Sequence, residues 1–170
     1  MKKYLIIVLV TTFLACSTHH KVAYQTIQNG NEKILKGYIN RSTLESDSTF
    51  KWFKENMKLG QVDANAVAAF SKNKYKFTMI VFGGTWCHDT QNLLPQFYRL
   101  VEKSGYPEKN ITLLAVDRKK QTVDDLHVKY AITNVPTFIV LKDGKEVARV
   151  VEYGKYGTAD KELGEIVAKL

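Results

Sequence analysis

The chain has 170 residues, of which 45% are hydrophobic and 25% are charged. This length allows one domain with a leader and a short tether, and this composition is that of a protein with a buried core, which excludes wholesale disorder. The formal net charge is +8, but the 25 Lys and Arg residues are scattered along the chain. Scattered cations are typical of a solvated surface and do not indicate a nucleic-acid partner.

The first residues have the pattern of an export signal. Two lysines are followed by an apolar run over residues 4–14, and then by Ala15 and Cys16. This run is too short to span a bilayer as a helix, which takes about 20 residues. Residues 1–15 resemble the signal peptide of bacterial lipoproteins, and an ordinary secretory signal cut nearby is the alternative. The resemblance implies that Cys16 is lipidated and that the protein is anchored to a membrane of the bacterial cell envelope, facing the periplasm.

The segment after the signal is predicted to contain a tether, a short strand and two helices. Residues 16–30 have little apolar periodicity, which predicts a flexible tether. The stretch 34–39 predicts a short strand. Apolar residues at helical spacing then predict helices over 48–57 and 64–72, the second with Asp63 as its N-cap. These segments are predicted to form an N-terminal helical extension.

The rest of the chain alternates between strand and helix patterns. Continuous apolar runs predict buried strands, and apolar residues on one face predict helices. In chain order the predicted elements are a strand over 77–82, a helix from Cys87 to about residue 104, a strand over 111–116, a short helix over 123–130, hairpin strands over 137–141 and 147–151, and a helix over 160–170. This order predicts an α/β fold with an α/β/α layering around a central mixed sheet.

Short motifs at the joints between these elements resemble those of the thioredoxin superfamily. They are Trp86-Cys87 at a strand-to-helix turn, Pro95 within the following helix, Val135-Pro136 before a strand, and Asp143-Gly144 in a hairpin turn. The resemblance implies a thioredoxin-like domain over residues 31–170, with its core from about residue 48.

The resemblance also implies which residues form the site. Cys87 is the expected reactive thiol, because a helix N-terminus presents unpaired N–H groups that favour a thiolate. A cis bond before Pro136 is expected to leave the backbone of Val135 free to pair with an extended substrate. The implied catalytic positions are Cys87 and Thr90, and the implied substrate-binding residues are Trp86, His88, Val135 and Pro136.

Two positions depart from the family pattern. Thr90 stands where members that reduce or form disulfides carry a second cysteine, and Val81 stands where classical thioredoxins carry a buried acid. With Cys16 lipidated, Cys87 is the one free thiol, so a self-contained dithiol cycle is excluded and an external resolving thiol is required. The predicted function is monothiol exchange with the thiols or disulfides of exported proteins, or with small thiols.

Other functions are left open by the sequence. One is a redox-inactive binding module that uses the Pro136 groove, and another is a thiol peroxidase, since a thiolate at a helix start can oxidise to sulfenic acid. Cys87, His88 and Asp89 carry metal-binding donors, but adjacent residues at a helix start cannot all point at one ion. No metal, no cofactor and no nucleic-acid partner is predicted.

Overall fold

The computed structural model describes residues 23–170. The expected signal peptide, the lipidation site Cys16 and residues 16–22 of the expected tether lie outside these residues. Within residues 23–170, no helix combines the length and the apolar character that crossing a membrane takes.

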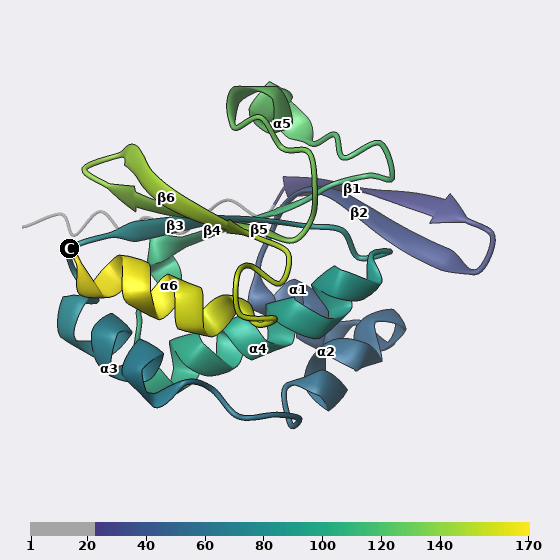
Figure 1. Cartoon of the computed structure of the whole chain (residues 1–170). Helices are drawn as coiled ribbons and strands as arrows, with labels where there is room; N and C mark the ends of the chain where they lie inside the picture. Colours follow the sequence, from purple (N-terminus) through teal and green to yellow (C-terminus); the bar gives the residue numbers. More distant parts are fainter. Residues whose placement is uncertain (1–22) are drawn as a thin grey trace, which may run out of the picture.

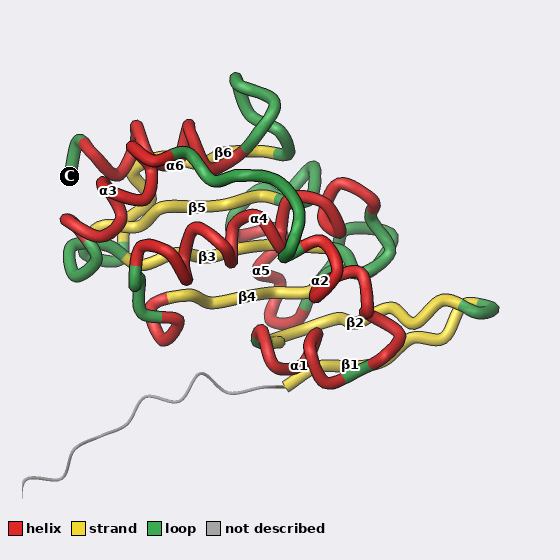
Figure 2. Tube along the Cα trace, turned by 90° about the horizontal axis from the view of Figure 1, so that it is seen from below, coloured by secondary structure: helices red, strands yellow, loops and turns green. Residues whose placement is uncertain are grey.

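A mixed sheet forms the centre of the fold. Its strands are β1 (Ala23–Asn29), β2 (Glu32–Ile39), β3 (Thr78–Gly83), β4 (Ile111–Ala115), β5 (Thr137–Lys142) and β6 (Lys145–Val151). They lie in the order β1-β2-β4-β3-β5-β6, as Figure 2 shows. The pair β3 and β4 is parallel, and the other neighbouring pairs are antiparallel. The central strands are the continuous apolar runs of the sequence, as expected for strands that are covered on both faces.

Helices cover the two faces of the sheet unequally. They are α1 (Arg41–Ser46), α2 (Lys51–Asn56), α3 (Ala64–Asn73), α4 (His88–Ser104), α5 (Leu126–Lys129) and α6 (Ala159–Ala168). In Figure 1, α5 lies above the sheet and the other helices lie below it. The predicted α/β/α layering is therefore confirmed, with one outer layer reduced to α5 and the turns beside it.

The larger apolar core lies between the sheet and the helices below it. Leu93, Phe97 and Leu100 of α4 are 1% exposed or less, and the ring of Phe97 lies 5.2 Å from that of Phe138 on β5. Burying a side chain of this size contributes about 1.5–3 kcal/mol. This packing fixes α4, and with it the start of the helix at Cys87.

A smaller apolar core lies on the other face of the sheet. Its buried members are Phe82, Leu114, Val116, Val135, Ile139 and Leu141. Trp86, Cys87 and Leu126 of α5 pack against it. The predicted site therefore lies at the edge of this core, where the β3 strand ends.

The prediction of a flexible tether over residues 16–30 is wrong for its second half. β1 pairs with β2 from Ala23 opposite Tyr38 to Asn29 opposite Glu32, and Gly30 opens the two-residue turn between them with a φ of +59°. Most side chains of β1 are exposed, so the strand is held by backbone hydrogen bonds that leave no apolar pattern in the sequence. The N-terminal extension is therefore a β-hairpin followed by the short helices α1 and α2.

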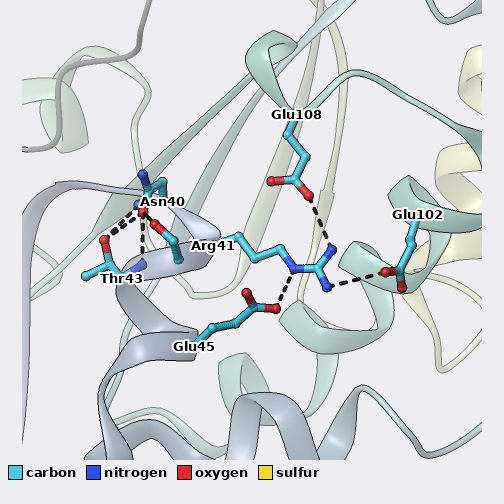
Figure 3. Close-up of polar contacts among 7 residues, drawn as sticks. Asn40, Arg41, Thr43, Glu45, Glu102 and Glu108 are labelled. Atoms are coloured by element: carbon cyan, nitrogen blue, oxygen red, sulfur yellow. Dashed lines mark hydrogen bonds and ion pairs between the residues drawn. The ribbon is translucent and has the colours of Figure 1, made fainter.

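Polar contacts attach α1 to the body of the domain (Figure 3). Asn40 caps the helix, with its side chain accepting a hydrogen bond from the N–H of Thr43 at 2.9 Å. The Arg41 guanidinium pairs with carboxylates from α1, from α4 and from the turn before β4, which are Glu45, Glu102 and Glu108. Because each of these ion pairs is partly exposed, it contributes about 1 kcal/mol at most.

Candidate functional site

Cys87 is the residue immediately before the first turn of α4. Its backbone N–H donates to the carbonyl of Gly84 at 2.9 Å, and its own carbonyl accepts from the N–H of Gln91 at 2.9 Å. The side chain is half-buried and is a free thiol. The turn therefore holds the sulfur at the N-terminal end of a long helix, where the helix dipole is positive.

The thiol contacts the loop that precedes β5. The Cys87 thiol donates to the carbonyl oxygen of Val135 over 3.3 Å, and the Val135–Pro136 peptide bond is cis, as expected. Val135 is 2% exposed and Pro136 is buried. The structure thus brings together three of the predicted site residues from two distant parts of the chain.

Thr90 lies beneath the loop that carries the thiol. It is 1% exposed, and its hydroxyl accepts a hydrogen bond from the N–H of Gly84 at 3.1 Å. Its methyl group fills the space beside Gly83, where an added Cβ would lie 2.9 Å away. A hydroxyl cannot attack a disulfide, so Thr90 supports the loop but cannot resolve a mixed disulfide.

Val81, which stands where classical thioredoxins carry a buried acid, lies on β3. The side chain is fully buried in the larger core, and in the sheet the residue lies opposite Leu113 and Phe138. Its surroundings are therefore apolar.

Trp86 is held by a hydrogen bond from its indole N–H and by a cation over the face of its ring. The indole N–H donates to the carbonyl of Val116 at 3.1 Å, and the guanidinium of Arg118 lies over the ring at 5.2 Å from its centroid. Arg118 in turn makes a bidentate ion pair with Glu32 of β2, with N–O distances of 2.7 to 3.0 Å. A stack of this kind is worth about 1 kcal/mol where it is partly exposed.

Thr85 attaches the N-terminal hairpin to the thiol loop (residues 84–87). Its hydroxyl accepts from the N–H of Leu35 and donates to the carbonyl of Lys33, both at 3.2 Å. The side chain is 6% exposed. Sequence reasoning missed Thr85, Arg118 and Glu32, because these contacts join residues far apart in the chain and no local pattern marks them.

The remaining polar residues lie on the outer side of the helix start. His88 is exposed, and the carboxylate of Asp89 accepts a hydrogen bond from the hydroxyl of Tyr153 at 2.9 Å. Tyr153 comes from the segment between β6 and α6, and the sequence analysis did not single it out. Among residues 23–170, no group of three or more His, Cys, Asp or Glu side chains could hold a metal ion.

A family model described as Thioredoxin matches residues 61–163, which is more than half of the chain. The chain belongs to the thioredoxin family. The match begins after α2, so the hairpin β1–β2 and the helices α1 and α2 of this thioredoxin-family protein lie outside it.

Individual relatives agree with this assignment. Thioredoxin-1 of Saccharomyces cerevisiae is 32% identical over 76 residues, covering 45% of this chain and 68% of the relative. Thioredoxin H2 of Arabidopsis thaliana is 26% identical over 99 residues, covering 58% of this chain and 66% of the relative. The chain spans only 25% of the TPR repeat-containing thioredoxin of the same plant.

Solved structures share the fold. A protein of unknown function from Pseudomonas aeruginosa has a TM-score of 0.50 and 19% identity, covering 75% of this chain and 86% of that chain. An HIV epitope-scaffold has a TM-score of 0.55 and 17% identity, covering 78% of this chain and 94% of that chain. These two structural matches cover more of this chain than the sequence matches to Thioredoxin-1 and Thioredoxin H2 do.

Proposed function

We propose that this thioredoxin-family protein is a monothiol that exchanges disulfides through Cys87. The observation that carries the proposal is the placement of the half-buried thiol at the start of α4, in contact with the Val135 carbonyl. Thr90 occupies the resolving position and is buried and hydrogen-bonded to Gly84. The site can therefore begin an exchange but cannot complete it alone.

The proposed reaction has two balanced steps. The Cys87 thiolate attacks one sulfur of a substrate disulfide, so a new S–S bond forms and the other substrate sulfur leaves as a thiolate. An external thiol then attacks the mixed disulfide at the substrate sulfur, which releases Cys87 as a thiolate and forms a disulfide between the external thiol and the substrate. Each step exchanges one disulfide for another, with no net oxidation or reduction.

We also propose that the protein is lipid-anchored at Cys16 and acts on exported proteins or small thiols in the periplasm. The support is the pattern of the leader. Because β1 begins at Ala23, the proposed tether is limited to residues 16–22. Seven extended residues span at most about 25 Å, so the domain would stay close to the membrane.

Trapping in cells tests the proposal. The full chain is produced with its leader in a bacterium, and cell-envelope extracts are alkylated and separated without reductant. We expect disulfide-linked adducts of the wild-type protein that disappear on reduction and are missing for Cys87→Ser. Cys16→Ala is expected to abolish incorporation of a labelled fatty acid. A wild-type protein that forms no adducts would contradict the exchange function.

A binding module without redox chemistry is the second candidate. The Cys87 thiol already has a hydrogen-bond partner in the Val135 carbonyl, and the buried Thr90 supplies no second thiol, so these contacts can serve binding without redox chemistry. This candidate predicts that Cys87→Ser, whose hydroxyl can make the same hydrogen bond, retains the partners of the wild-type protein. The exchange function predicts that these partners are lost.

A further inference from the structure

A cavity of about 480 Å³ lies beside the thiol loop, in a part of the molecule that the family match only partly covers. Its walls come from the β1–β2 hairpin, from the start of α2 and from the thiol loop and its neighbours. Among the lining residues are Glu32, Lys33, Trp52, Thr85, Gln91 and Arg118. The N-terminal extension therefore adds a concave surface to the thiol site.

The cavity is connected to Cys87 through two of its lining residues. Thr85 is two positions before the cysteine, and the backbone N–H of Gln91 donates to the Cys87 carbonyl at 2.9 Å. The side-chain amide of Gln91 donates to the carbonyl of Thr85, also at 2.9 Å, so these two lining residues are joined directly. Because Thr85 lies two residues from Cys87, at most about 7 Å along the backbone, a polypeptide joined to Cys87 by a disulfide reaches the cavity within a few residues.

The charges that line the cavity are already paired. Lys33 makes an ion pair with Asp47, and Arg118 makes its bidentate pair with Glu32. A ligand carboxylate would therefore compete with a protein carboxylate for each cation and would gain less than it would at an unpaired cation. The cavity thus disfavours an anionic ligand relative to a neutral one.

Uncharged groups make up most of the remaining wall. The side chains of Asn29, Asn31 and Thr49 offer hydrogen-bond donors and acceptors, and Trp52 offers an apolar surface. Trp52 is half-buried and packs edge to face against Phe53, with ring centroids 5.9 Å apart. Amide and hydroxyl groups beside an aromatic ring suit the backbone and the uncharged side chains of a polypeptide.

We propose that this cavity is a subsite for the uncharged polypeptide segment that flanks the target cysteine. The favoured substrates are then those whose target cysteine is flanked by an uncharged segment, and acidic flanking segments are disfavoured. This inference rests on the proposed exchange through Cys87 and adds to it the class of substrate.

The test uses activated disulfides that all carry the same 2-thiopyridyl leaving group, so that reaction with the thiol releases thiopyridone and can be followed by absorbance. The probes are N-acetylcysteinamide, a neutral peptide with its cysteine at the centre, and the same peptide with glutamate flanks. The proteins are the full chain, Trp52→Ala, Asn31→Lys, and the control Tyr75→Ala, which changes an exposed ring outside the cavity. The adduct is located at Cys87 by fragment mass.

We expect the neutral peptide to react about tenfold faster than N-acetylcysteinamide, and the acidic peptide to lack this advantage. Trp52→Ala should remove most of the advantage and leave the rate with N-acetylcysteinamide within about twofold. Asn31→Lys changes an exposed turn position and supplies an unpaired cation. It should therefore raise the reaction rate of the acidic peptide relative to that of the neutral peptide.

Two results would overturn the subsite and leave the exchange function standing. One is an equal rate for the neutral peptide, the acidic peptide and N-acetylcysteinamide. The other is a peptide advantage that neither Trp52→Ala nor Asn31→Lys alters. A Cys87 that reacts with none of the probes, including N-acetylcysteinamide, would contradict the exchange function itself and the subsite with it.

Discussion

The thiol of Cys87 donates a hydrogen bond to the carbonyl oxygen of Val135, 48 positions later in the chain. The contact joins the start of α4 to the loop before β5, and it places the sulfur beside a backbone carbonyl that an extended substrate could use instead. Beneath it, Thr90 holds the loop through Gly84. Together the two contacts fix the thiol loop between the start of α4 and the loop before β5.

Replacing Thr90 by cysteine should convert the site to a dithiol. Side chains three positions apart at a helix start lie within about 5–6 Å, which a disulfide can bridge. We expect Thr90→Cys to form an internal disulfide with Cys87 on oxidation, detected as the loss of both thiol hydrogens by intact mass. The reduced variant should be less stable by about 1 kcal/mol, because the Gly84 N–H loses its acceptor. Thr90→Ser is the control, and a Thr90→Cys protein that keeps both thiols free under oxidant would contradict this placement.

Releasing Arg118 from the hairpin should change the environment of Trp86. Glu32→Gln removes the charge that orients Arg118 over the indole ring. In a Trp52→Phe background, we expect a red-shifted emission of Trp86 and faster quenching by acrylamide. The loss of stability should stay below about 1 kcal/mol, because the ion pair is partly exposed. Glu146→Gln breaks a similar pair elsewhere and should leave the emission unchanged; equal spectra for both variants would contradict the stack.

The pair between Lys33 and Asp47 should make stability depend on acid. The hydrogen bond from Lys33 lowers the pKa of Asp47 from 3.8 to about 2. A lowered pKa stabilises the folded state above the unfolded value, and this contribution is lost as the pH falls from 3.8 toward about 2. Asp47→Asn keeps the cap on Thr49 but removes the charge.

Urea unfolding over this pH range measures the effect of that charge. At neutral pH the wild-type protein should exceed Asp47→Asn by about 1 kcal/mol, and the difference should vanish near the lower end of the range. Asp143→Asn, in the exposed turn between β5 and β6, is the control. A difference that is the same at both ends would show that the charge is not responsible.

Gly164 should be required for the contact between α3 and α6. A Cβ added there would lie 2.5 Å from the Cα of Ala66 and 2.7 Å from its Cβ. Alanine favours a helix by about 1 kcal/mol over glycine, but this clash forces the helices apart. We expect Gly164→Ala to lower the free energy of unfolding by about 1–3 kcal/mol. Ala168→Ser, exposed on the same helix, should change it little, and a stabilised Gly164→Ala would refute the close approach.

The sequence predicted the elements that bury apolar side chains. The strand that ends at Gly83, the helix that starts after Cys87 and the hairpin around Asp143 all follow from apolar periodicity and turn residues. β1 was missed because its side chains are mostly exposed and its pairing with β2 is a backbone property. The predicted helix over 123–130 is shorter than expected, since Asp124 and Asp125 adopt left-handed conformations with φ of 54° and 48°.

The same distinction holds for the site. The motif residues Cys87 and Pro136 could be placed because each lies at a joint between elements with a clear pattern. Thr85, Glu32 and Arg118 could not, because their roles arise when the hairpin folds back onto the thiol loop. Exposed ion pairs and single hydroxyl groups carry no periodic signal, so their partners become known only from the folded chain.

The most direct test of the account follows the Cys87 adduct over time. The reduced full chain is mixed with an excess of a neutral peptide disulfide, excess reagent is removed, and intact mass and fragment mass are recorded before and after a reducing thiol is added. The account predicts a single peptide on Cys87 that persists until the external thiol is added and is then released. A chain that acquires no peptide at Cys87, or that loses the peptide without an added thiol, would contradict a monothiol mechanism.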